Sequence, residues 1–186
     1  MRRALVTIVV SMLPAVAAAQ GAPVADAFKQ NAQQVAKNLI AAAEEMPADK
    51  YSFRPTPAQM SFAMVVTHLA QGNDYLCGKI GGSTAPTRAK IDTTASKDEM
   101  VARLRETFDY CNTQLAKLDD SHLGEVIPLF GTRKAQRASV MTTATGDWAD
   151  HYSQSAIYLR LNGLLPPSAQ RPAAAAGAAK APPKNP

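Results

Sequence analysis

The chain has 186 residues, with 20 lysines and arginines against 15 aspartates and glutamates, and a formal net charge of +5. The surplus comes from basic residues near the two ends: Arg2, Arg3, Arg171, Lys180 and Lys184. Residues 20–168 therefore carry equal numbers of both signs. A folded region without net positive charge disfavours a nucleic-acid-binding surface, although a pI of 9.3 alone would suggest one. We expect no nucleic-acid partner.

The first residues follow the order of a cleavable secretory signal. Residues 1–3 include two arginines, residues 4–16 are mainly apolar, and residues 17–19 are alanines. We expect a signal peptide at residues 1–19, cleaved after Ala19. Because the apolar run is shorter than the roughly 20 residues that cross a bilayer, we expect no stable membrane span after cleavage. The expected location is periplasmic or secreted.

The last residues, 169–186, are dominated by alanine and proline and contain no aromatic residue and no large aliphatic one. Such a composition cannot bury enough apolar surface to fold, so we expect a disordered tail. Residues 20–168 remain, with enough chain for one domain and one hydrophobic core.

Apolar residues recur at helical spacing in four segments of this domain. The predicted helices span about residues 24–46, 57–80, 96–118 and 139–162. Gly81 and Gly82 should end the second helix, and Ser96 with Glu99 forms the pattern of a capping box at the start of the third. Residues 119–137 contain proline and glycines and are expected to form a long crossing loop. Four helices without a strand pattern between them predict an all-α four-helix bundle.

The last predicted helix breaks its own apolar stripe. The stripe runs through Val140, Ala144, Asp147, His151, Gln154 and Tyr158. Burying a carboxylate and an imidazole is costly unless they are paired or bind a metal. Asp147 and His151 are spaced i and i+4 and project from one face. Two interpretations stay open: a hydrogen-bonded pair, or two ligands of one metal ion.

A metal site needs a third ligand from another helix. His68 lies at the margin of the second helix's apolar stripe, near Tyr75, which suits a residue that faces a cleft between helices. A lone histidine in such a place is more often a packed or surface residue than a ligand. His122 lies in the crossing loop beside two aspartates and is expected to be exposed to solvent.

These segments resemble the DinB-like family of metal-binding four-helix bundles. The resemblance covers most of residues 22–168 and is carried by the following segments: the connector Pro47–Pro55, His68, Asp147–Gln154, Tyr158–Gly163 and Pro166–Pro167. It implies a bundle with long crossover connections. It also implies a divalent ion held by three histidines, one from the second helix and two spaced four apart on the last.

His68 and His151 match two of these three ligands, and Asp147 stands where the family more often has histidine. The resulting set of two imidazoles and one carboxylate suits Zn, Ni or Fe. Gln154, Tyr158 and Tyr75 would then line the pocket or support the ligands.

The chain has two cysteines, Cys77 and Cys111, on or near the apolar faces of adjacent predicted helices. In an oxidising compartment such a pair favours a disulfide, which would add about 3 kcal/mol. A pair of reactive thiols is the alternative, although the spacing is unlike that of a redox centre.

Two functions remain open at this stage. The first is a metal-dependent enzyme, hydrolase-like or a transferase, acting on a small-molecule substrate, with no catalytic residue assigned beyond the metal ligands. The second is a non-catalytic periplasmic module that binds a small molecule or responds to stress. The sequence is compatible with a homodimer and identifies neither the substrate nor the metal.

Overall fold

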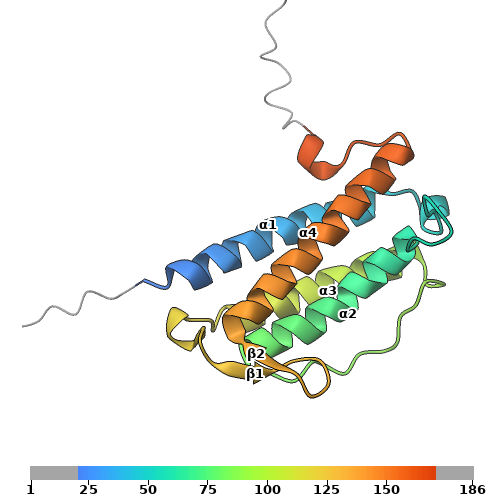
Figure 1. Cartoon of the computed structure of the whole chain (residues 1–186). Helices are drawn as coiled ribbons and strands as arrows, with labels where there is room; N and C mark the ends of the chain where they lie inside the picture. The colour runs from blue at the N-terminus through green and yellow to red at the C-terminus, as the bar shows by residue number, and fades with distance from the viewer. Residues whose placement is uncertain (1–20, 171–186) are drawn as a thin grey trace, which may run out of the picture.

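The structure, a computed structural model, describes residues 21–170 and builds them around four long helices (Figure 1). The helices are α1 (Pro23–Glu45), α2 (Phe62–Gly81), α3 (Lys97–Leu115) and α4 (Arg137–Leu161). Shorter elements connect them: η1 (Ala48–Lys50), η2 (Asp120–His122), β1 (Val126–Pro128), β2 (Lys134–Gln136) and η3 (Pro167–Ala169). The predicted helical bundle is confirmed. The predicted signal peptide and nearly all of the predicted tail lie outside the described residues.

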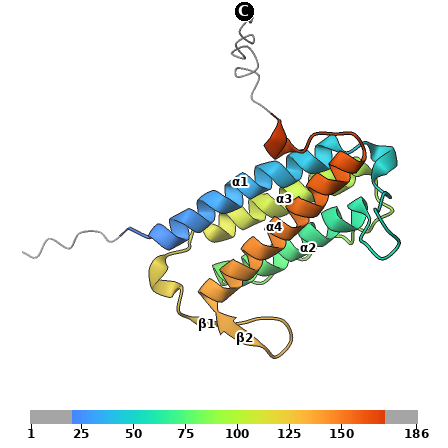
Figure 2. The same cartoon turned by 45° about the horizontal axis from the view of Figure 1, so that its top comes forward.

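The four helices lie side by side (Figure 2). Helix α2 packs mainly against α3 and α4, and α1 packs against the same two helices. Helices α1 and α2, although consecutive in the chain, therefore occupy opposite corners of the bundle, and their connector crosses its end. Between the helices lies a core of fully buried apolar side chains, among them Leu39, Leu104, Trp148 and Leu159. In residues 21–170, no helix is both long enough and apolar enough to cross a membrane.

Helix α2 begins at Phe62, five residues later than the sequence pattern predicts, because the proline-rich connector supplies its cap. The Ser61 hydroxyl accepts a hydrogen bond from the Met64 backbone N–H at 3.2 Å. The carbonyls of Tyr51 and Phe53 accept hydrogen bonds from the backbone N–H groups of Ala63 and Phe62, respectively. At the other end Gly82 adopts a left-handed conformation with φ of 73°, the predicted glycine stop.

The segment predicted as a plain crossing loop contains a short β-hairpin. Strands β1 and β2 pair antiparallel, with Ile127 opposite Ala135. Helix α4 starts directly after β2, at Arg137. The buried Arg137 guanidinium donates to the carbonyls of Lys79 and Ile80, the last turn of α2. The hairpin thus places the first residue of α4 beside the last turn of α2, so the two helices run antiparallel.

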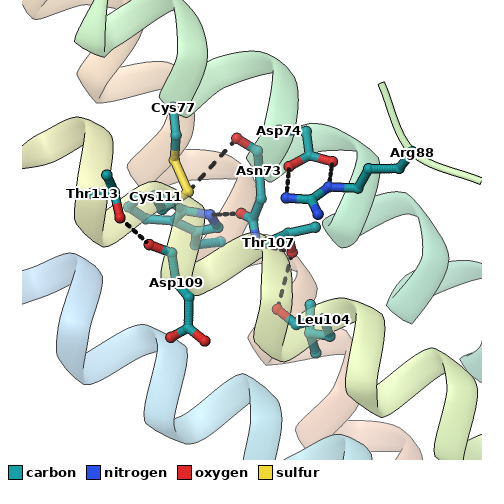
Figure 3. Close-up of a disulfide and its surroundings, with 10 residues drawn as sticks. Asn73, Asp74, Cys77, Arg88, Leu104, Thr107, Asp109, Cys111 and Thr113 are labelled. Carbon is teal, nitrogen blue, oxygen red and sulfur yellow. Dashed lines mark hydrogen bonds and ion pairs between the residues drawn. A yellow bond between two sulfur atoms is a disulfide. The ribbon is translucent and has the colours of Figure 1, made fainter. Parts of the chain in front are cut away.

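A disulfide joins α2 to α3 (Figure 3). Cys77 and Cys111 are both buried, and their Cα atoms lie 5.0 Å apart. One turn away, the Asn73 side-chain amide donates to the Thr107 hydroxyl at 3.3 Å. The structure therefore contains the disulfide expected from the sequence and not the alternative pair of free thiols.

Candidate metal centre

The three residues predicted as metal ligands lie on α2 and α4, whose antiparallel packing is fixed at several levels. Near one end the Tyr158 hydroxyl donates to the Met60 carbonyl at 2.8 Å. Deeper in the bundle the Trp148 indole N–H donates to the Asn73 side-chain oxygen at 2.7 Å. Between these two contacts the register brings His68 opposite His151.

Three side chains converge at this level. His68, Asp147 and His151 each offer one ligand atom, and these atoms all lie within 4.8 Å of one another. Asp147 Oδ1 lies 3.6 Å from His68 Nε2 and 3.5 Å from His151 Nδ1. The two imidazole rings stack with centroids 4.8 Å apart. The structure brings together the three residues singled out from the sequence, and their role as metal ligands stays a prediction.

The backbone contact of His151 indicates the tautomer of its neutral ring. Its Nδ1 lies 2.7 Å from the carbonyl oxygen of Asp147. A carbonyl can only accept a hydrogen bond, so Nδ1 carries the proton and the lone pair resides on Nε2. Metal-binding histidines are commonly held in this way, with one ring nitrogen fixed by a carbonyl and the other free to ligate.

The Asp147 carboxylate is incompletely satisfied. Its Oδ2 atom is buried and has no hydrogen-bond partner within the described part of the chain. A desolvated carboxylate oxygen without a partner is costly. A cation held by Asp147 Oδ1 and the two imidazoles would offset part of the cost of burying the carboxylate charge, and a set of two imidazoles and one carboxylate fits a divalent metal ion such as Zn, Ni or Fe.

The site is open on one side. The His68 side chain is 49% exposed, whereas those of Asp147 and His151 are 20% and 8% exposed. Of the three candidate ligands, His151 is buried, Asp147 is partly buried and His68 lies at the surface. A small molecule could reach a bound ion from the His68 side.

Two residues beside the candidate metal centre were not indicated by the sequence pattern. Trp148 follows Asp147 and is buried, with its indole N–H on Asn73. Gly72 lies on α2 beneath the Asp147 carboxylate, and a Cβ atom built at Gly72 would lie 3.3 Å from Oδ2. The spacing of four between His68 and Gly72 was the only available indication, because a glycine has no side chain to contribute to a pattern.

The three predicted pocket residues lie elsewhere along the two helices. The Gln154 amide donates to the Asp150 carboxylate at 2.7 Å on the exposed side of α4. The Tyr158 hydroxyl is held by the Met60 carbonyl, and burial raises the pKa of this phenol. The Tyr75 ring stacks on Phe130 of the hairpin. Within residues 21–170, no hydrogen bond, ion pair or ring stacking joins these side chains to the cluster, and their role at the site stays a prediction.

His122, the remaining histidine, lies apart from the cluster and is exposed, as expected. Its Nδ1 lies 2.6 Å from Glu125 Oε1. The other oxygen of Glu125 accepts from Arg137 at 2.6 Å. Hydrogen bonds from Arg137 and His122 lower the pKa of the Glu125 carboxyl.

Comparison with known proteins identifies the family and the fold of the chain. The sequence profile of the DinB superfamily matches residues 31–155, a segment that contains all three candidate ligands. No curated protein matches the chain in sequence.

Several solved structures share the fold. A DinB-like protein from Bacillus subtilis is 19% identical, with a TM-score of 0.63 over 78% of this chain and 99% of its own. A DinB-like protein from Bacillus cereus is 15% identical, with a TM-score of 0.63 over 76% of this chain and 95% of its own. A conserved protein from Enterococcus faecalis is 15% identical, with a TM-score of 0.55 over 74% of this chain and 96% of its own. The profile match and the shared fold together show that this chain belongs to the DinB superfamily.

Proposed function

We propose that this protein binds one divalent metal ion through His68, Asp147 and His151 and catalyses the metal-assisted hydrolysis of a small molecule. The observation that carries the proposal is the convergence of three ligand atoms, from two helices, within 4.8 Å of one another. A bound divalent ion acts as a Lewis acid and lowers the pKa of a coordinated water.

The chain's own residues have separate tasks in this proposal. His151 offers the Nε2 lone pair of an imidazole whose orientation is fixed by the Asp147 carbonyl. The Asp147 carboxylate supplies one negative charge, which favours a cation in a partly buried site. His68 forms the exposed side of the cluster, where a substrate would approach. No described residue is assigned as a general acid or base.

We further propose that the protein acts outside the cytoplasm. The N-terminal order of basic, apolar and small residues supports export. The disulfide between Cys77 and Cys111 supports an oxidising compartment. Thiol-transfer chemistry needs a low-molecular-weight thiol, which is scarcer there, and hydrolysis is therefore the better-supported reaction.

The proposal is tested first by metal content. Protein purified without an affinity tag should contain close to one equivalent of Zn, Ni or Fe per chain by elemental analysis. The variant His68→Ala should lose it, and His122→Ala should keep it, because His122 pairs with Glu125 outside the cluster. Metal far below one equivalent in the wild type, unchanged in His68→Ala, would contradict the metal site.

A non-catalytic module is the competing function. It is favoured by the Asp147 Oδ1 atom, which lies 3.6 Å and 3.5 Å from nitrogens of the two imidazoles and could pair with them without any metal. Chelator-sensitive hydrolysis of small ester, amide or phosphate substrates distinguishes the two functions. A metal-loaded protein without such activity would leave binding as its function.

A further inference from the structure

We propose that Gly72 is a positioning residue of the metal centre, because its missing side chain admits the Asp147 carboxylate between α2 and α4. This inference rests on the proposed metal site and identifies the residue that shapes it. A Cβ atom at position 72 would lie 3.3 Å from Asp147 Oδ2, closer than most Cβ contacts in proteins. Gly72 is thus the place where α2 makes room for a carboxylate on α4.

The two oxygens of this carboxylate face different surroundings. Oδ2 is buried against α2 at Gly72, without a hydrogen-bond partner among the described residues. Oδ1 faces the two imidazoles at 3.6 Å and 3.5 Å. A side chain at position 72 would press on Oδ2 and turn the carboxylate about its Cβ–Cγ bond. The consequence would be a misplaced Oδ1, the carboxylate oxygen that lies within 3.6 Å of both imidazoles.

The helices cannot easily slide to relieve such a pressure. On each helix the next residue takes part in a buried hydrogen bond, from the Trp148 indole to the Asn73 side chain at 2.7 Å. Asn73 is tied in turn to Thr107 on α3 at 3.3 Å, one turn from the disulfide. With the register fixed by these contacts, a change at Gly72 acts on the carboxylate itself.

A pair of glycine variants tests the proposal. Gly72→Ala places a methyl group against Asp147, whereas Gly146→Ala places one on α4 where a Cβ atom meets nothing within 4 Å. Zinc affinity is measured by competition with a chromogenic chelator, together with the visible absorption of the Co(II)-loaded protein. We expect Gly72→Ala to bind zinc about 10-fold or more weakly and to change the Co(II) spectrum. Gly146→Ala should match the wild type in both measurements.

Two further measurements separate positioning from a general effect on folding. Unfolding of the metal-free variants shows whether Gly72→Ala folds, and Gly72→Ser provides a second variant with a small side chain. In an Asp147→Ala background, Gly72→Ala should cause no further loss of zinc affinity, because the carboxylate on which it acts is gone. An equal loss with and without Asp147, or no loss in Gly72→Ala, would overturn the inference. A wild-type protein that binds no zinc would instead overturn the proposed function, and this inference with it.

Discussion

Helix α2 makes two contrasting contacts with its neighbours. Against α3 it is joined by the Cys77–Cys111 disulfide and by the Asn73–Thr107 hydrogen bond, all buried. Against α4 it presents His68, which is half exposed. The α3 contact is completed by the protein's own groups, whereas the α4 contact leaves a buried carboxylate oxygen of Asp147 without a partner.

The contrast is that α2 is closed covalently on its α3 side, whereas its α4 side also carries the candidate metal ligand His68. A covalent bond and a buried side-chain hydrogen bond hold α2 in place from the α3 side. This leaves the α4 side free to carry charged groups that do not by themselves stabilise the fold. Mutations on the two sides should therefore have separable effects.

The largest expected effect is on the α3 side. The double variant Cys77→Ala/Cys111→Ala should lose about 3 kcal/mol of unfolding free energy, because the disulfide closes a long loop. Urea denaturation measures this loss, and zinc affinity should change far less. A reducing agent should destabilise the wild type similarly and leave the double variant unchanged. A double variant as stable as the oxidised wild type would contradict the idea that the disulfide stabilises the α3 side of α2.

The second effect is on the α4 side and depends on metal. Free zinc at 100 times its dissociation constant should stabilise the wild type by about 2.7 kcal/mol. His68→Ala should abolish this stabilisation while its metal-free stability stays close to that of the wild type, because the side chain is half exposed. Thermal unfolding with zinc and with chelator measures both quantities.

The matched control for this measurement is His122→Ala, which should respond to zinc as the wild type does, since His122 lies outside the cluster. Acidification should reduce the zinc effect, because protonated imidazoles do not bind metal. A zinc response that survives in His68→Ala would place the ion elsewhere.

A third effect concerns the hydrogen bond beside the cluster. Trp148→Phe removes the indole N–H and leaves the buried Asn73 oxygen without its donor, at a cost of about 1–3 kcal/mol. Tyr152→Phe is the control, because the Tyr152 hydroxyl accepts a hydrogen bond from the Ser168 N–H in an exposed setting. Urea denaturation of the two metal-free variants should show a clear loss only for Trp148→Phe. Equal losses would mean that the indole N–H has no special part in fixing the register.

Helical periodicity was sufficient to predict the bundle, and together with the family resemblance it indicated the three candidate ligands. Asp147 and His151 were visible as polar residues inside an apolar stripe. His68 was visible because its position at the edge of the α2 stripe suited a cleft. The family resemblance then joined residues from two helices that no local pattern relates.

The remaining features depend on tertiary packing. Trp148 is buried beside Asp147 because α4 packs between two other helices, so its buried face is wider than the single stripe read from the sequence. The hairpin is too short to produce a strand pattern, with three residues in each strand. Gly72 acts through the space that it leaves, which becomes visible only once Asp147 is placed against it.

The smallest expected effect tests whether that space is specific. A glycine in the interior of a helix costs about 0.5–1 kcal/mol relative to alanine. Gly146→Ala should therefore stabilise the metal-free protein by about that amount, since its new methyl group meets nothing within 4 Å. Gly72→Ala gains the same helical preference but must displace Asp147 Oδ2. Its net gain in unfolding free energy, measured by urea denaturation, should therefore be smaller, or become a loss. Equal gains in unfolding free energy for the two variants would mean that a methyl group fits between α2 and α4 at Gly72, and that α2 is not shaped around the carboxylate.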